Sequence, residues 1–212
     1  MLASTLIVGT TGSGKSYFLN QILSRQAEDN SAMWVLIDPK RVELHKWTKS
    51  HAQNVLYYAD NTSDFYVAVN AAYSQMMIRL DVMQQKGITE TDEKPIYVVV
   101  DEMALLMSDR KHAKSYGEML GKIAVIGRAA HVYVVACTQV PTRKNLPNEL
   151  VDNITNSVVL RLRDMSRARY VFGPGFDFTG HLPAYGVGYL MSTFDDQPRR
   201  MNTEDMLEEM EV

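Results

Sequence analysis

The sequence contains a single cysteine and no long apolar run. One cysteine, Cys137, excludes an internal disulfide framework and a cysteine-rich zinc site. The longest apolar runs, such as residues 96–100 and 132–137, fall far short of the roughly 20 residues that span a bilayer. No charged segment precedes the glycine-rich motif that begins at Gly9, so a secretory signal is not expected. We expect a globular domain of a reducing, cytoplasmic compartment, with no direct membrane contact through this segment.

The net charge of −3 gives no sign of nucleic-acid binding when taken as a total. Acidic residues gather from position 195 onward, however, and leave the preceding body slightly basic. Basic side chains cluster at Arg110, Lys111 and Lys114, and again at Arg161, Arg163, Arg167 and Arg169. Such clusters on a near-neutral body can form a phosphate-binding surface, and a solvated charged face explains either cluster equally well.

Short apolar runs alternate with longer helical periods along the chain. With 46% apolar residues, the 212-residue chain can bury one sizeable core. Strands are expected at residues 6–8, 33–38, 55–58, 96–100, 132–138, 158–162 and 187–191. Helices are expected at residues 16–26, about 61–87, 116–130, 146–153 and 166–172. Apolar strands alternating with helices indicate an α/β fold, with a mainly parallel sheet and helices on both faces. We assign residues 1–202 to one domain and residues 203–212 to an acidic tail or peripheral helix.

Residues 9–16 (GTTGSGKS) match the phosphate-binding loop pattern G-x-x-x-x-G-K-[ST]. The glycines permit backbone angles that aim successive N–H groups at phosphate oxygens. Lys15 can reach the β- and γ-phosphates of ATP, and the Ser16 hydroxyl can ligate Mg²⁺. The position between an expected strand and an expected helix favours a nucleotide site over a structural turn. The expected nucleotide contacts are Gly9, Thr10, Thr11, Gly12, Ser13, Gly14, Lys15, Ser16 and Tyr17.

Acidic and amide side chains follow two of the expected strands. Asp101 ends an apolar strand, where its carboxylate can hold Mg²⁺ through water, and Glu102 can orient or deprotonate an attacking water. Gln139 follows the next strand and can sense the γ-phosphate. The alternatives are a strand-end cap, a surface acid and an ordinary polar strand terminus. The five histidines have no metal-ligand spacing.

Several segments together resemble the motor domain of the FtsK/SpoIIIE family of double-stranded DNA translocases, within the HerA–FtsK group. In chain order they are LIVGTTGSGKS, VLIDPKRVEL, YVVVDEMALLM, GRAAHVYVVACTQVP, NITNSVVLRLRDMSRAR and GVGYLMSTFDDQPRR. The resemblance implies a RecA-like P-loop ATPase that assembles as a ring, usually a hexamer, and pumps DNA through its pore. Within this sequence we expect neither a membrane anchor nor a winged-helix DNA-reading domain. It is either a minimal motor or an excised part of a larger protein, whose other segments would supply any membrane tether.

The resemblance also assigns roles to single residues. Lys15 and Ser16 match the nucleotide and Mg²⁺ contacts, Asp101 and Glu102 the metal and catalytic acids, and Gln139 the sensor. Three arginines of the family pattern are candidates for contacting a neighbouring subunit's γ-phosphate: Arg128, Arg161 and Arg169. The chain departs from the family where His131 replaces a glycine, Val140 an arginine and Arg167 an aspartate, and these changes affect the inter-subunit contacts.

An ATP-driven translocase of double-stranded DNA is the function that these observations favour. A related motor that moves protein, as in type VII secretion, and a conjugative coupling protein remain alternatives. A nucleotide kinase fits the length but lacks an arginine-rich lid. For a DNA motor, we expect Arg110, Lys111 and Lys114 to face the DNA phosphates from a polar loop at residues 108–115. A solvated turn explains the same loop.

Overall fold

The computed structural model describes residues 2–27, 31–176, 178 and 184–210. Within them, eight strands form one sheet in the order β3-β2-β4-β5-β1-β6-β7-β8. The strands are β1 (Thr5–Val8), β2 (Met33–Ile37), β3 (Val55–Ala59), β4 (Ile96–Val100), β5 (Val132–Thr138), β6 (Asn156–Val159), β7 (Val187–Ser192) and β8 (Arg199–Asn202). The α-helices are α1 (Lys15–Ala27), α2 (Trp47–Ser50), α3 (Thr62–Lys86), α4 (Met103–Leu106), α5 (Ala113–Ile126), α6 (Asn148–Val151), α7 (Arg169–Phe172) and α8 (Thr203–Met210). Two 3₁₀ turns, η1 (Ala52–Asn54) and η2 (Met165–Ala168), complete the described elements.

The first six strands are parallel, which confirms the expected sheet. β1 lies between β5 and β6, and β4 lies between β2 and β5. Every residue of β4 and β5 is buried, as the uninterrupted apolar runs require for strands covered on both faces. β7 and β8 are antiparallel additions beside β6. β8 was not expected, because its Arg-Arg-Met-Asn sequence carries no apolar alternation.

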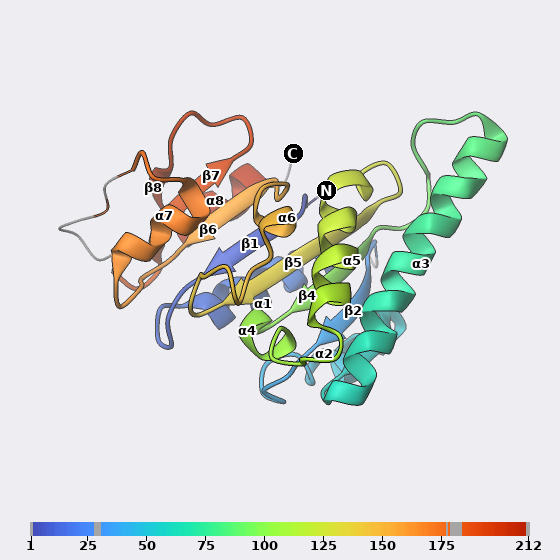
Figure 1. The fold of residues 1–212 in the computed structure, drawn as a ribbon, viewed down its shortest axis with the longest axis horizontal. Coiled ribbons are helices and arrows are strands. Elements are labelled where there is room, and N and C mark those ends of the chain that lie inside the picture. The colour runs from blue at the N-terminus through green and yellow to red at the C-terminus, as the bar shows by residue number, and fades with distance from the viewer. Residues whose placement is uncertain (1, 28–30, 177, 179–183, 211–212) are drawn as a thin grey trace.

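Helices cover both faces of the sheet (Figure 1). Phe65 and Met76 of α3 and Leu120 of α5 pack into one apolar cluster. Phe18 of α1 and Met206 of α8 pack into the other cluster, on the opposite face. In Figure 1, α3 and α5 lie in front of the sheet and α1 lies behind it. None of the helices in the described ranges combines the length and hydropathy that a bilayer span needs.

Local signals set the ends of α3, close to the bounds expected from the sequence. The Asn61 side chain accepts a hydrogen bond from the Asp64 N–H at 3.3 Å, which caps the first turn. Gly87 ends the helix in the left-handed conformation, at φ 66°. The described part of the acidic tail is α8, and residues 211–212 lie outside the described residues. α8 packs its apolar side against the sheet.

The segment after β4 differs from the expected loop. A short helix, α4, follows the acid pair, and α5 begins at Ala113 rather than at residue 116. Lys114 therefore lies in the first turn of a helix. Asp109 holds the intervening turn, because its carboxylate accepts hydrogen bonds from the Tyr116 hydroxyl at 2.8 Å and the Lys111 N–H at 3.1 Å. Polar composition alone did not reveal this fixed turn.

Candidate nucleotide-binding site

The phosphate-binding loop joins β1 to α1 at the carboxyl edge of the sheet. Its backbone is anchored to both neighbouring strand ends. The Gly9 N–H donates to the Thr138 carbonyl at 3.1 Å, and the Thr10 N–H donates to the Arg161 carbonyl at 3.0 Å. The Ser13 N–H closes the loop on the Thr10 carbonyl at 3.0 Å. The loop is thus fixed in place by the ends of β5 and β6.

Each glycine of the loop meets a specific steric demand. Gly12 and Gly14 adopt φ values of 78° and 93°, which side chains of L residues rarely allow. At Gly9 a Cβ atom would lie 2.4 Å from the Ser13 Oγ and 3.1 Å from the Leu160 Cβ. Positions 12 and 14 therefore need glycine for their backbone conformation, as expected, whereas position 9 needs glycine because a side chain there would clash with its neighbours.

Lys15 and Asp101 meet at the centre of the site, from the start of α1 and the end of β4. The Lys15 Nζ donates to the Asp101 carbonyl at 3.2 Å and lies 3.5 Å from its Oδ1. Asp101 is fully buried and Glu102 is 4% exposed. Lys15 and Asp101 lie close together because the parallel strands β1 and β4 both end at this edge, one on each side of β5. The two residues are neighbours in space although they lie far apart in the sequence.

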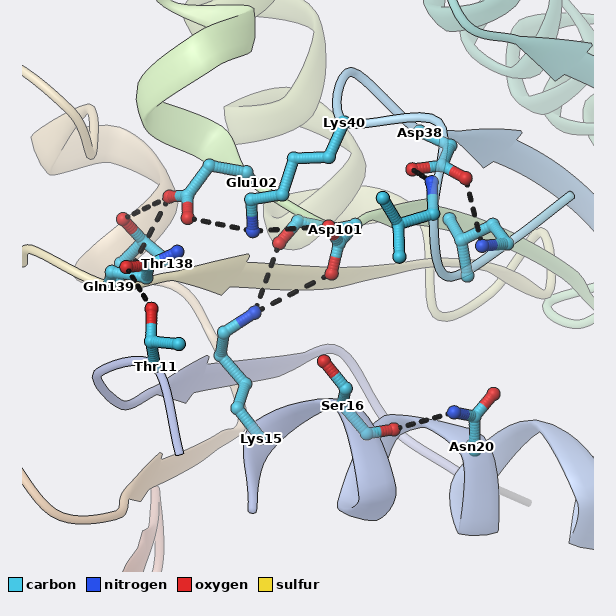
Figure 2. A network of polar contacts seen from close by, with 12 residues as sticks. Thr11, Lys15, Ser16, Asn20, Asp38, Lys40, Asp101, Glu102, Thr138 and Gln139 are labelled. Carbon is cyan, nitrogen blue, oxygen red and sulfur yellow. Dashed lines mark hydrogen bonds and ion pairs between the residues drawn. The ribbon is translucent and has the colours of Figure 1, made fainter. Parts of the chain in front are cut away.

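A second lysine, Lys40, stands between the two acids (Figure 2). It comes from the loop after β2, and its Nζ lies 3.2 Å from the Asp101 Oδ2 and 3.1 Å from the Glu102 Oε2. Burial lowers the pKa of Lys40, but the charges of Asp101 and Glu102 outweigh that effect and raise the pKa above its ordinary value. Lys40 is therefore a charged part of the site. It was not among the expected site residues, although it lies in the IDPKRVEL segment.

The other oxygen of Glu102 is held by the end of β5. Its Oε1 accepts hydrogen bonds from the Thr138 hydroxyl at 3.0 Å and the Gln139 N–H at 3.3 Å. The Gln139 side chain in turn accepts a hydrogen bond from the Thr11 hydroxyl at 3.1 Å. Figure 2 shows this chain running from the acid to the phosphate-binding loop. Thr138 is a second participant that the strand pattern alone did not single out.

A cavity of about 350 Å³ opens above these groups. Lys15, Lys40 and Gln139 line its floor, and exposed tyrosines line its rim. The Tyr185 ring lies 3.5 Å from where a Cβ of Gly14 would stand, and 68% of this tyrosine is exposed. Tyr17, from the first turn of α1, is also exposed. The cavity thus combines a cationic floor with an aromatic rim, which suits a phosphate group attached to a planar base.

The residues present fit a divalent cation that is shared with a phosphate ligand. Both carboxylate oxygens of Asp101 are buried, and neither accepts a hydrogen bond of acceptable geometry from the described residues, despite the ion pairs to two lysines. The same part of the chain holds no cluster of three or more histidine, cysteine or acidic side chains that would bind a metal by itself. Mg²⁺ usually takes one or two protein ligands together with phosphate oxygens, so Ser16 and Asp101 would be its protein partners.

The three candidate arginines lie at different places in the fold. Arg161 follows β6 at the carboxyl edge, where its carbonyl also accepts from the Thr10 hydroxyl at 3.1 Å. The side chain of Arg169, in α7, donates to the Phe176 carbonyl at 3.2 Å. Arg128 is exposed and precedes β5, at the amino edge of the sheet. Seven residues of β5 separate Arg128 from the phosphate-binding loop, roughly 20 Å at the usual rise per residue.

The basic residues expected to face DNA are exposed, in the turn between α4 and α5 and at the start of α5. Arg110 and Lys111 lie in the turn itself. The Lys114 Nζ lies 3.7 Å from the Glu118 Oε1, an exposed pair that contributes little stability. These residues follow the carboxyl end of β4, as the acid pair does, but they do not line the cavity.

Comparisons with known proteins point to the same family as the sequence motifs. The model of the FtsK/SpoIIIE family matches residues 1–93, which include the phosphate-binding loop and Lys40. The DNA translocase FtsK of Chlorobaculum tepidum is 30% identical over 200 residues, which cover 80% of this chain and 25% of the relative. The chain spans only about a quarter to a third of the length of the curated relatives it matches.

Solved structures share the fold at low sequence identity. The conjugation coupling protein TcpA of pCW3, with ATPγS, superposes with a TM-score of 0.76 at 16% identity, over 95% of this chain and 60% of that one. The cytoplasmic domain of the type VII secretion ATPase EccC of Thermomonospora curvata gives 0.71 at 20% identity, over 94% of this chain and 25% of that one. These likenesses confirm the P-loop ATPase fold. The match of the family model to residues 1–93 and the FtsK relative show that this chain belongs to the FtsK/SpoIIIE family, as an ATP-binding P-loop domain.

Proposed function

We propose that this domain hydrolyses Mg²⁺-ATP and uses the turnover to move double-stranded DNA. The observation that carries the hydrolytic part is the contact of Lys15 with Asp101 and of Lys40 with both Asp101 and Glu102, beside the cavity that the two lysines line. A kinase would need the γ-phosphate to meet an acceptor, whereas an acid beside the phosphate site suits activation of a water. Relatives that are named as DNA translocases support the DNA part.

The residues divide the work of binding and proton transfer. The backbone N–H groups of the loop, with Lys15, would hold the phosphate oxygens, and Ser16 with Asp101 would hold Mg²⁺. When bound, the ion neutralises charge that develops on the phosphates. Glu102 would accept a proton from water at its Oε2, since its Oε1 is already occupied by Thr138 and Gln139.

Two substitutions test the hydrolytic proposal. Lys15→Ala should lose ATP binding, because the cation that contacts the phosphates is gone. Glu102→Gln should still bind ATP but turn over at least ~10²-fold more slowly, the usual scale for loss of a general base. ATP affinity is measured by titration calorimetry and turnover by phosphate release. Equal turnover in the wild type and Glu102→Gln would refute the assignment of Glu102.

The DNA part has its own test. Linear duplex DNA should stimulate ATP hydrolysis, and Arg110→Ala, Lys111→Ala and Lys114→Ala together should abolish that stimulation while basal hydrolysis survives. The matched control removes three exposed lysines elsewhere, at Lys46, Lys49 and Lys86. Unchanged DNA affinity and salt dependence in the first triple variant would return the turn to a solvated surface.

A protein-moving motor is the second candidate, because the fold is shared with a type VII secretion ATPase. Absence of any response to duplex DNA, combined with normal Glu102-dependent hydrolysis, would favour it. For either motor we propose a closed ring, built through head-to-tail interfaces between copies. Sedimentation at high protein concentration with ATP and duplex DNA should show an oligomer, and a monomer under those conditions would oppose the ring.

A further inference from the structure

Lys40 occupies the position between two carboxylates that a catalytic cation would also need. Its ammonium contacts Asp101 at 3.2 Å and Glu102 at 3.1 Å. Neither carboxylate oxygen of the fully buried Asp101 accepts a well-formed hydrogen bond from the described residues, so ion pairs with Lys15 and Lys40 are the contacts that compensate its charge. Burying adjacent carboxylates without a cation is unfavourable, because each charge is removed from water beside a like charge. Lys15 contributes a cation to Asp101, and Lys40 supplies the one that contacts both acids.

The same ammonium blocks the chemistry proposed for the acids. The Glu102 Oε2, the oxygen left over by Thr138 and Gln139, is the one that Lys40 holds. The ammonium therefore occupies the oxygen that an attacking water would have to reach. Lys40 also takes one of the two Asp101 oxygens that a divalent cation would approach.

The surroundings allow the side chain to move while its backbone stays fixed. The Asp38 carboxylate accepts from the Val42 N–H at 3.3 Å and the Leu44 N–H at 2.9 Å, which bridges the backbone on either side of Lys40. The Asp38 N–H donates to the Ala59 carbonyl at 2.8 Å. The Lys40 side chain is 27% exposed and lines the cavity. Rotation of its four-carbon stem can therefore carry the ammonium from the acids into the cavity.

We propose that Lys40 is the resident counter-cation of Asp101 and Glu102, and that it competes with a divalent cation for Asp101. This inference rests on the proposed function only in taking Asp101 as a metal ligand. An anionic ligand in the cavity attracts the ammonium away from the acids at the same time as it delivers a cation to Asp101. Lys40 thereby makes metal binding depend on the nucleotide, and its withdrawal frees the Glu102 Oε2.

The test measures Mn²⁺ binding to the nucleotide-free protein, by the loss of the free-ion signal in electron paramagnetic resonance. Lys40→Met, which keeps the length of the side chain without its charge, should bind Mn²⁺ at least about tenfold more tightly than the wild type. Lys40→Arg keeps the charge and should resemble the wild type. Lys46→Met, an exposed lysine of the same loop, is the matched control and should also resemble the wild type. Lys40→Gln serves as a second neutral variant if Lys40→Met does not fold.

The location of the ion is checked by Asp101→Asn in the Lys40→Met background, which should abolish the gain. Equal Mn²⁺ affinity in the wild type and in a folded neutral variant would overturn the proposal, and so would a gain that survives Asp101→Asn. These outcomes are separate from hydrolysis. If Glu102→Gln turned over normally while Lys40→Met still gained Mn²⁺, the proposed function would fail and the counter-cation role would stand.

Discussion

Replacing Thr138 by valine tests whether the end of β5 holds Glu102, the proposed catalytic acid. The side chains are nearly the same size, so the change removes the hydroxyl without opening a cavity. It deletes the 3.0 Å hydrogen bond to the Glu102 Oε1 and the weaker one accepted from the Val140 N–H at 3.4 Å. A hydrogen bond to a charged group contributes about 1.5–3 kcal/mol. Because the Gln139 N–H still contacts the same oxygen, we expect Thr138→Val to lower the free energy of unfolding by about 2 kcal/mol.

The assay is urea unfolding at neutral pH, arranged as a double-mutant cycle with Glu102→Ala. Thr138→Ser is the control, since it keeps the hydroxyl and loses only a buried methyl group, at about 1 kcal/mol. The cycle should give a coupling free energy of about 1–2 kcal/mol between positions 138 and 102. Coupling below about 0.5 kcal/mol would show that the hydroxyl does not support Glu102, and would refute this view of the site.

Three further outcomes follow from local geometry. Gly14 and Gly87 both have left-handed backbones, at φ 93° and 66°, so Gly14→Ala and Gly87→Ala should each lower the free energy of unfolding by about 1–2 kcal/mol. Only Gly14→Ala should weaken ATP binding in calorimetry. Tyr185→Ala should weaken binding of ATP about tenfold and leave binding of inorganic tripolyphosphate unchanged, if the ring stacks on the base; equal losses for both ligands would refute stacking. Burial raises the pKa of Cys137 from 9.0 to about 12, so the thiol of the folded protein should resist alkylation at pH 9 and react on unfolding. The contribution of this group to stability should be full below pH 9 and lost as the pH rises through 12. Rapid alkylation of the folded protein would contradict this.

The sequence indicated the nucleotide-binding core because its signals are local. The glycine-rich loop, Lys15 and the strand that ends in Asp101 each lie within a few residues of a recognisable strand or helix end. In a parallel sheet these ends meet at one edge, so the pairing of Lys15 with Asp101 could be expected without knowledge of the strand order. The ends of α3 were equally local, in Asn61 and Gly87.

Lys40 could not be placed in the same way. It reaches the acids because β2 lies directly beside β4, although β3 and α3 intervene in the sequence. Strand order depends on packing between distant segments, which periodicity does not report. His131 shows a similar limit: its φ of 51° explains why the family pattern has glycine there, and contacts with Glu90 and the Glu93 carbonyl hold the side chain. Neither contact could be read from the spacing.

The distance between Arg128 and the phosphate-binding loop also has a consequence for how a mutation at Arg128 would act when mutant and wild-type chains are mixed. A side chain at the far edge of the sheet does not reach the phosphates of its own chain, so a lesion there leaves that chain able to fold and to hold nucleotide. In a ring where Arg128 completes the next copy's site, the defect appears in an otherwise intact neighbour. If the proposed ring forms and Arg128 acts in this way, such an allele would be dominant when mixed with the wild type, and activity would fall faster than the fraction of altered chains. A lesion at Lys15, by contrast, first disables the copy that carries it.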